Sequence, residues 1–234
     1  MTSSIQRRRV FLADDHVVLR QSLKAILEQH DLEVVGEADD GHSAAKMCHA
    51  LQPEIAILDI GMPLLNGIDA TREIRKDCPH TKIILLTMYA DESCVLAALR
   101  AGITGYVLKS SAFSHLTQAI EAVSRGETYL SPAITGTVVK AYFSNAAPLP
   151  SNALSDRERQ VLQLIAEGKN MKEAGSTLGI SAKTADTHRR RIMHKLNIFS
   201  TAGLVRFALK NGLIIEPSPG PEDANGLLAQ SKAA

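Results

Sequence analysis

Short apolar runs alternate with stretches of helical periodicity along the first half of the chain. The run at 55–58 is wholly apolar, which is typical of a strand buried on both faces of a parallel sheet. Runs of this kind predict strands at 10–13, 32–38, 55–59, 82–87 and 105–109. Apolar residues at helical spacing predict helices at 18–27, 43–51, 67–76, 93–101 and 113–125. Strict alternation favours an α/β fold, a flavodoxin-like (βα)5 domain with strand order 2-1-3-4-5.

The first and last of these helices have clear apolar faces. In the first helix, the residues assigned to the core are Val18, Leu19, Leu23, Ile26 and Leu27. In the last helix, the residues assigned to the core are Phe113, Leu116, Ile120 and Val123. We expect each set to pack against the sheet, because residues three or four positions apart share one helix face.

The pattern changes after the fifth helix. Residues 144–152 are small, polar and contain Pro, which predicts a tether between domains. A short helix at 134–143 is expected to lead into this tether. The predicted bounds are 8–127 for the α/β domain, 128–152 for the linker, 153–216 for an all-α domain and 217–234 for a disordered tail.

Capping and turn residues mark four helices in the second domain. Ser155 and Glu158 form a capping box before the first helix, which Gly168 ends. A short helix at 172–178, a turn at Gly179 and a longer helix capped by Ser181 come next, and a fourth helix is expected at 200–211. A short helix, a Gly-containing turn and a basic longer helix form the helix-turn-helix signature.

Composition is that of a globular protein. Of 234 residues, 45% are hydrophobic and 22% are charged, and the length suffices for two domains. No apolar run is long enough to cross a bilayer, and no secretory segment is recognisable near the N-terminus. The three cysteines show no CxxC spacing and are expected to be reduced thiols. These features predict a cytoplasmic protein with no membrane partner.

Charge is distributed unevenly between the two predicted domains. The formal net charge of the chain is +1. Residues 153–216 hold eleven Lys and Arg against six Asp and Glu, so this domain carries +5 and the remainder −4. A basic module beside an acidic one indicates that only the second meets a polyanion, although charge alone also fits an ordinary solvated surface.

Polar residues stand at the carboxyl ends of four predicted strands: Asp14, Asp15, Asp59, Thr87 and Lys109. Because those ends meet at one edge of a parallel sheet, we expect the five side chains to converge there. Three carboxylates repel one another unless a cation is bound, and oxygen ligands suit Mg²⁺. A metal, a Lys and an acceptor carboxylate together indicate phosphoryl transfer to Asp59.

One class of enzyme uses similar residues. Mg²⁺-dependent phosphatases of the haloacid dehalogenase type also place Asp, Lys and Thr on an α/β sheet. Their nucleophile is the first Asp of a DxD motif on the first strand. This chain has the adjacent pair Asp14 and Asp15 there and a lone Asp59 on the third strand. The spacing therefore favours a switch over a phosphatase.

A family resemblance is carried by the same strand-end residues, together with the segment 59–63, Gly67 and the strand 105–109. Through them the region 10–126 resembles the receiver domain of bacterial two-component response regulators. The resemblance implies that a partner histidine kinase phosphorylates Asp59. It also implies Mg²⁺ ligands, namely Asp15, Asp59 and the Gly61 carbonyl, with Asp14 acting through water.

The same resemblance implies a switch. Thr87 and Tyr106 correspond to the pair in which a hydroxyl moves to the phosphoryl oxygens and an aromatic ring turns inward. One departure is Ser110, which stands where many receivers have Pro. This departure leaves open the geometry of the loop after Lys109.

The third helix of the second domain has two distinct faces. A core stripe is expected from Ala185, His188, Ile192 and Leu196. The opposite face fits a major groove and comprises Lys183, Asp186, Thr187, Arg190 and His194. Phosphate contacts are expected from Lys183, Thr184, Arg189 and Lys195. The alternative interpretation is that this helix is a basic, solvated helix of an ordinary bundle. The cap, the turn and the charge together disfavour that alternative.

Motifs across the second domain match a second family, at 154–158, 168–169, 172–173, 178–181, 183–184, 187–188 and 195–196. Through them the region 153–215 resembles the LuxR-type helix-turn-helix. The combination with a receiver is the architecture of the NarL/FixJ group of response regulators. It implies binding to double-stranded DNA and a homodimer when phosphorylated or DNA-bound, often joined through the last helix. A second domain that binds protein or RNA is an alternative, which the lack of exposed aromatics on the basic helix disfavours for RNA.

Three residues depart from the LuxR-type pattern. Met171 replaces the usual Asn, and Ala174-Gly175 replace a large aliphatic residue and Ala. A glycine within a helix costs about 1 kcal/mol relative to Ala. We therefore expect a less stable short helix, and a gain in stability when Gly175 is replaced by Ala.

Together these patterns predict a transcription factor rather than an enzyme. The expected function is that of a two-component response regulator whose DNA binding is controlled by phosphorylation of Asp59. In the unphosphorylated state, the receiver is expected to mask either the DNA face or the dimer face.

Overall fold

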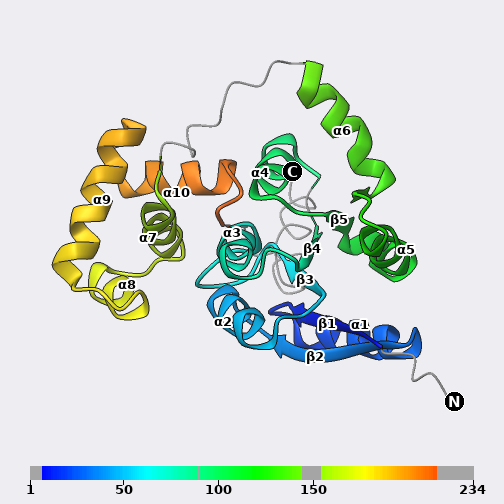
Figure 1. The fold of residues 1–234 in the computed structure, drawn as a ribbon. Helices are drawn as coiled ribbons and strands as arrows, with labels where there is room; N and C mark the ends of the chain where they lie inside the picture. Colours follow the sequence, from blue (N-terminus) through cyan, green and yellow to red (C-terminus); the bar gives the residue numbers. More distant parts are fainter. Residues whose placement is uncertain (1–6, 89, 144–153, 215–234) are drawn as a thin grey trace, which may run out of the picture.

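The computed structural model describes residues 7–88, 90–143 and 154–214. The expected tether at 144–152 and the expected tail at 217–234 lie outside the described residues. The first domain is built on a parallel sheet of order β2-β1-β3-β4-β5-β6 (Figure 1). Its strands are β1 (Arg8–Ala13), β2 (Leu32–Ala38), β3 (Ile55–Asp59), β4 (Lys82–Thr87), β5 (Gly105–Leu108) and β6 (Tyr129–Leu130). The predicted flavodoxin-like order is confirmed for the first five strands.

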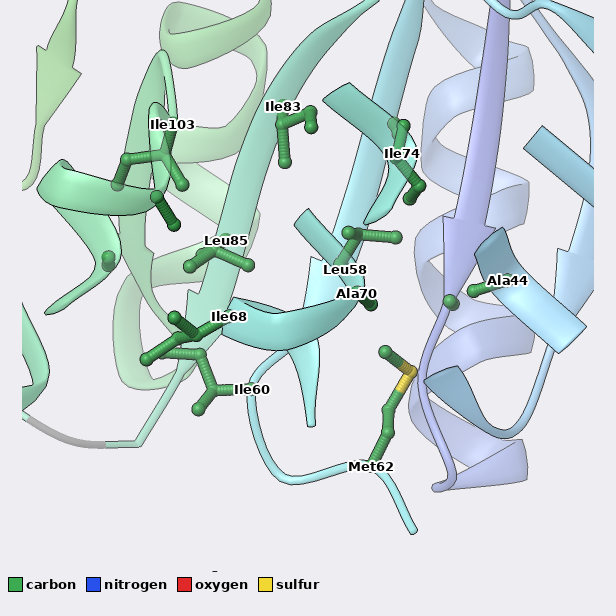
Figure 2. Close-up of a cluster of buried hydrophobic side chains, with 14 of the residues drawn as sticks. Ala44, Leu58, Ile60, Met62, Ile68, Ala70, Ile74, Ile83, Leu85 and Ile103 are labelled. Atoms are coloured by element: carbon green, nitrogen blue, oxygen red, sulfur yellow. The ribbon is translucent and has the colours of Figure 1, made fainter. Parts of the chain in front are cut away.

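Helices cover both faces of this sheet, as the alternation predicts. They are α1 (Val17–Gln29), α2 (Gly41–Leu51), α3 (Gly67–Asp77), α4 (Glu92–Ala101) and α5 (Ala112–Ser124), with the 3-10 turn η1 (Lys109–Ser111) before α5. One core lies between the sheet and helices α1 and α5. The other core lies between the sheet and helices α2, α3 and α4, and includes Ile60, Met62 and Ile68 (Figure 2).

A strand and a helix occupy part of the predicted linker. Strand β6 pairs with β5, so that Gly105 lies opposite Tyr129, and α6 (Pro132–Phe143) packs against α4. Ser131 ties this segment to the sheet, because its N–H donates to the Tyr106 carbonyl at 2.9 Å. A strand of two residues is too short to give a period, which is why the pattern predicted only five strands.

Two residues assigned to the core are exposed. Val18 is 82% exposed and Phe113 is 58% exposed, so the prediction was wrong for both. Each lies in the first turn of its helix, at the carboxyl edge of the sheet. The later residues Leu23 and Leu116 are buried as expected.

The second domain has the four predicted helices. They are α7 (Asp156–Ala166), α8 (Met171–Thr177), α9 (Ala182–Leu196) and α10 (Thr201–Lys210). The capping box of Ser155 and Glu158 is present, and Ser181 caps α9 through the Thr184 N–H. Helix α9 faces the core with the fully buried side chains of Ala185 and Ile192.

Gly175 has a packing role that the sequence pattern did not reveal. A Cβ atom built at Gly175 would lie 2.8 Å from the Ile180 carbonyl oxygen and 3.1 Å from the Ala182 nitrogen. Helix α8 therefore contacts the backbone of the turn before α9, and only glycine permits this approach. The expectation that Ala would stabilise this position is contradicted by these distances.

The two domains meet through α7 and the chain after α10. Both face α3 and α4 of the first domain, while α9 lies on the far side of the second domain (Figure 1). Asn66 at the start of α3 contacts Gln163 of α7, and Ser93 of α4 donates to the Lys210 carbonyl at 3.3 Å. Within the described ranges, no helix is both long and apolar enough to cross a membrane.

Candidate functional site

Three carboxylates meet at the carboxyl edge of the sheet. Asp14 and Asp15 follow β1, and Asp59 ends β3. Oxygen atoms of all three lie within 4.8 Å of one another and of a His16 nitrogen. His16 was not predicted, although it directly follows the Asp pair. Its N–H donates to Asp14 Oδ1 at 2.8 Å, and its Nδ1 lies 2.7 Å from Asp15 Oδ1.

Lys109 joins two of these carboxylates. Its Nζ lies 2.8 Å from Asp14 Oδ2 and 2.9 Å from Asp59 Oδ2, and the Lys109 side chain is only 8% exposed. Burial acts against the ammonium charge, but the carboxylates of Asp59 and Asp14 outweigh it and raise the pKa of Lys109. The structure thus brings Asp14, Asp59 and Lys109 together, as the strand ends indicated.

Asp59 is held in a crowded, buried position. Burial raises the pKa of Asp59, Lys109 opposes this shift, and the N–H of Gly61 also bonds to the carboxylate. Gly67 packs directly on the backbone here, since an added Cβ would lie 2.1 Å from the Asp59 carbonyl oxygen. One ammonium group does not balance three facing carboxylates, so the arrangement suits a small cation with oxygen ligands.

The expected switch pair lies beside this site. Thr87 ends β4 and Tyr106 lies on β5, and both side chains are fully buried. Burial raises the pKa of Tyr106, and its hydroxyl shares side-chain hydrogen bonds with Thr87 and with Cys94 of α4. The pair is therefore linked to the first turn of α4.

The residues predicted to contact DNA lie along α9. Two of them are half-buried, Asp186 and Arg189. The other six are exposed, namely Lys183, Thr184, Thr187, Arg190, His194 and Lys195. Asp186 accepts from Arg189 and from Arg190 Nε, both at 2.9 Å. Hydrogen bonding from Arg189 is the main cause that lowers the pKa of Asp186. Asp186 thus orients two arginines.

Lys195 is partly committed to its own domain. Its Nζ lies 2.7 Å from Glu158 Oε2, and the Glu158 side chain is only 4% exposed. Burial opposes the Glu158 charge, but Lys195 and the Ser155 N–H outweigh it and lower the pKa of Glu158. This ion pair competes with the predicted phosphate contact of Lys195.

The sequence predicted that the receiver covers part of the second domain, but it did not identify the residues that join the two domains. Gln163 is only 1% exposed, although it lies within an apolar stretch of α7. Its side chain reaches Asn66 and Met62, which follow the phosphoacceptor candidate Asp59. The one signal in the sequence was the Gln163 amide, which lies in the middle of an apolar run and so indicated a buried polar contact.

Comparisons with known proteins identify relatives of both domains. The model of the response regulator receiver domain matches residues 10–121, and that of the luxR family of bacterial regulatory proteins matches residues 152–208. The oxygen regulatory protein NreC of Staphylococcus carnosus is 39% identical over 214 residues, 88% of this chain and 99% of NreC. The transcriptional regulatory protein LiaR of Bacillus subtilis is 38% identical over 208 residues, 88% of this chain and 99% of LiaR.

Solved structures resemble most of the chain, across both domains. RcsB of Salmonella typhimurium matches with a TM-score of 0.61 and 28% identity, covering 88% of this chain and 98% of RcsB. A complex of the response regulator RcsB with DNA matches with a TM-score of 0.54 and 28% identity over the same shares of the two chains.

Proposed function

Because the chain belongs to the response regulators that join a receiver domain to a LuxR-type helix-turn-helix, we propose that phosphorylation of Asp59 controls its binding to DNA. The phosphodonor is a partner histidine kinase in the cytoplasm. The observation that supports this most strongly is Lys109 Nζ, which lies within 3 Å of both Asp14 and Asp59. The relatives are regulators rather than enzymes, which disfavours the phosphatase alternative.

The phosphoryl step is a displacement at phosphorus. An oxygen of the Asp59 carboxylate forms the new P–O bond, and the P–N bond of the phosphohistidine breaks. The electron pair of that bond stays on the imidazole, which takes up a proton from solvent. Lys109 is close enough to neutralise phosphoryl oxygens next to Asp59. Asp15, Asp59 and the Gly61 carbonyl would hold Mg²⁺, with Asp14 acting through water, and the bound ion would further neutralise these oxygens.

The conformational signal passes through Thr87 and Tyr106. When Asp59 carries a phosphoryl group, the Thr87 hydroxyl donates to it and changes its contact with Tyr106. Tyr106 contacts Cys94, and the neighbouring Ser93 contacts the end of α10 through the Lys210 carbonyl. A shift of α4 therefore reaches the helix that is expected to form the homodimer.

Helix α9 is the DNA-reading element in this proposal. Lys183, Thr184 and Arg189 contact phosphates, and Arg190 reaches a base edge in the major groove. Since α9 lies away from the receiver (Figure 1), we favour control through the dimer face over masking of the DNA face. The RcsB–DNA complex is a precedent for DNA binding by a similar chain.

The test is fluorescence anisotropy on a cognate promoter. Genomic fragments selected by the phosphorylated protein provide that promoter. We expect acetyl phosphate or beryllofluoride to strengthen binding of the wild type and to leave Asp59→Asn unchanged. Equal affinities of the two proteins under phosphorylating conditions would refute control through Asp59.

A further inference from the structure

His16 faces the acidic cluster from the rim of the site. Its Nδ1 lies 2.7 Å from Asp15 Oδ1 and 3.3 Å from Asp14 Oδ1, and its side chain is 69% exposed. Lys109 approaches from the interior instead, since it contacts the Oδ2 atoms of Asp14 and Asp59 and is only 8% exposed. The carboxylates therefore lie between a buried ammonium group and an accessible imidazole.

The backbone that carries His16 is fixed at three points. The Asp14 N–H donates to the Ala38 carbonyl of β2 at 3.1 Å, and Arg20 of α1 donates to the Asp14 carbonyl. The His16 N–H donates to Asp14 Oδ1 at 2.8 Å. His16 is also the N-cap residue of α1, but its side chain makes no capping bond. The imidazole is therefore not used by the helix, while its backbone is held beside the carboxylates.

One ligand atom from each of four residues lies in a compact group. Oxygens of Asp14, Asp15 and Asp59 and a His16 nitrogen all lie within 4.8 Å of one another. Ligand atoms that share one cation at about 2.0–2.2 Å lie at most about 4.4 Å apart, so small side-chain rotations bring the group together. The exposed His16 side chain has room for such a rotation. The His16 nitrogen therefore belongs to the donors that a cation meets at this edge of the sheet.

An imidazole nitrogen changes which cation such a site prefers. Mg²⁺ takes oxygen ligands and keeps several of its waters, so a nitrogen donor contributes little to its affinity. Imidazole instead suits transition-metal dications such as Fe²⁺, Ni²⁺ and Zn²⁺. Three carboxylates alone suit a hard cation, whereas three carboxylates with one imidazole should favour a dication that binds nitrogen and oxygen together.

We propose that His16 is a ligand residue of the cation site, and that it gives this site a preference for a transition-metal dication over Mg²⁺. The inference rests on the proposed function, because it concerns the cation at the phosphoryl site. The ligand is defined by its class, a dication of the series from Fe²⁺ to Zn²⁺. Asp15 and Asp59 serve either class of cation, so the choice between the two classes depends on the imidazole.

The test compares Mg²⁺ with Co²⁺, which represents the transition-metal class, on the full chain. His16→Ala removes the imidazole without removing a capping bond. His30→Ala is the matched control, because His30 is an exposed histidine at the opposite end of the same helix. Isothermal titration calorimetry at one fixed pH gives the affinity of each protein for each cation.

We expect the wild type to bind one Co²⁺ ion that excess Mg²⁺ displaces. His16→Ala should weaken Co²⁺ binding by roughly tenfold or more, since even residues that only support a metal ligand contribute about 10–100-fold. Its Mg²⁺ affinity should change by a much smaller factor, and His30→Ala should match the wild type for both cations. In the proton NMR spectrum, a ring resonance shifted by bound Co²⁺ should be present in the wild type and absent in His16→Ala.

Every other pattern overturns the inference. An equal loss of affinity for both cations in His16→Ala would show that the imidazole only orients Asp15, and unchanged affinities would show that it has no part in binding. A gain for both cations would show that the ring obstructs the site. A shifted ring resonance that persists in His16→Ala would assign Co²⁺ to another histidine.

The proposed function is tested separately, by formation of the acyl phosphate in the wild type with Mg²⁺ and acetyl phosphate. Its absence would refute the function itself. Its presence, together with any of the overturning patterns of cation affinity, would refute the inference alone and leave the function intact.

Discussion

Arg159 of α7 donates to Asp69 of α3 across the domain boundary, with 2.9 Å between Arg159 Nε and Asp69 Oδ1. The Arg159 side chain is 9% exposed and the Asp69 side chain is 6% exposed. Arg159 also donates to the Leu154 carbonyl at 2.8 Å. This ion pair therefore joins the start of the second domain to the first turn of α3, ten residues beyond the phosphoacceptor candidate Asp59.

Removal of Arg159 should destabilise the docked protein. Arg159→Ala leaves Asp69 buried, with Arg72 as its one remaining charged partner among the described residues. A lost hydrogen bond to a charged group costs about 1.5–3 kcal/mol, and urea unfolding measures this loss. Arg125→Ala is the control, because its pair with Glu127 is exposed and should contribute less than about 1 kcal/mol. Equal losses in the two variants would contradict a structural role for the interdomain pair.

Lys109 should be required for phosphoryl transfer. Lys109→Met removes the ammonium group that lies within 3 Å of Asp14 and Asp59. Loss of a preorganised group that stabilises developing charge typically lowers a rate by roughly 10²-fold or more. Acyl phosphate formation from acetyl phosphate, followed by mass spectrometry, measures the rate. Lys46→Met, at an exposed position of α2, should react as the wild type, and similar rates for the two variants would count against the proposed role.

Gly175→Ala should destabilise the second domain, contrary to the helix propensity of the two residues. The new Cβ would lie 2.8 Å from the Ile180 carbonyl oxygen, and forced shifts of this kind cost about 1–3 kcal/mol. Gly136→Ala in α6 is the matched control, since an added Cβ there meets no atom of the described chain within 4 Å. That variant should gain roughly 0.5–1 kcal/mol. Thermal unfolding of both variants measures these changes in stability. A more stable Gly175→Ala variant would contradict the close approach of α8 to the turn.

Arg190 and Lys183 should affect DNA binding in different ways. Arg190→Ala should weaken the free energy of binding to the cognate site by about 1–3 kcal/mol and relax specificity at one base position. Lys183→Ala should instead weaken binding to all sequences, and should reduce the slope of the logarithm of the binding constant against the logarithm of the salt concentration by about 1. Anisotropy with cognate and scrambled duplexes at several salt concentrations distinguishes the two effects. Identical profiles for the two variants would argue against a base contact by Arg190.

Much of the architecture follows from local pattern. Asp14, Asp59 and Lys109 were recognised because strands that are buried on both faces are unmistakably apolar, and the carboxyl ends of parallel strands share one edge. Ser155, Glu158 and Ser181 were recognised as caps because capping depends on residues only a few positions apart. Sequence by itself therefore determined the strand order of the first five strands, the acidic edge of the sheet and the helices of the second domain.

Only the tertiary structure decided how the two domains touch. Gln163 and Asn66 are 97 residues apart, and no periodicity relates surfaces that belong to separate domains. Tertiary contacts also decide the roles of Lys195 and Gly175. The partner of Lys195 is Glu158, which belongs to another helix. Glycine is required at position 175 because the backbone of the following turn lies close to it. Exposure at Val18 and Phe113 depends on where the sheet ends beneath each helix. Contacts within one element repeat with its period and are readable in sequence, whereas contacts between elements depend on how whole surfaces meet.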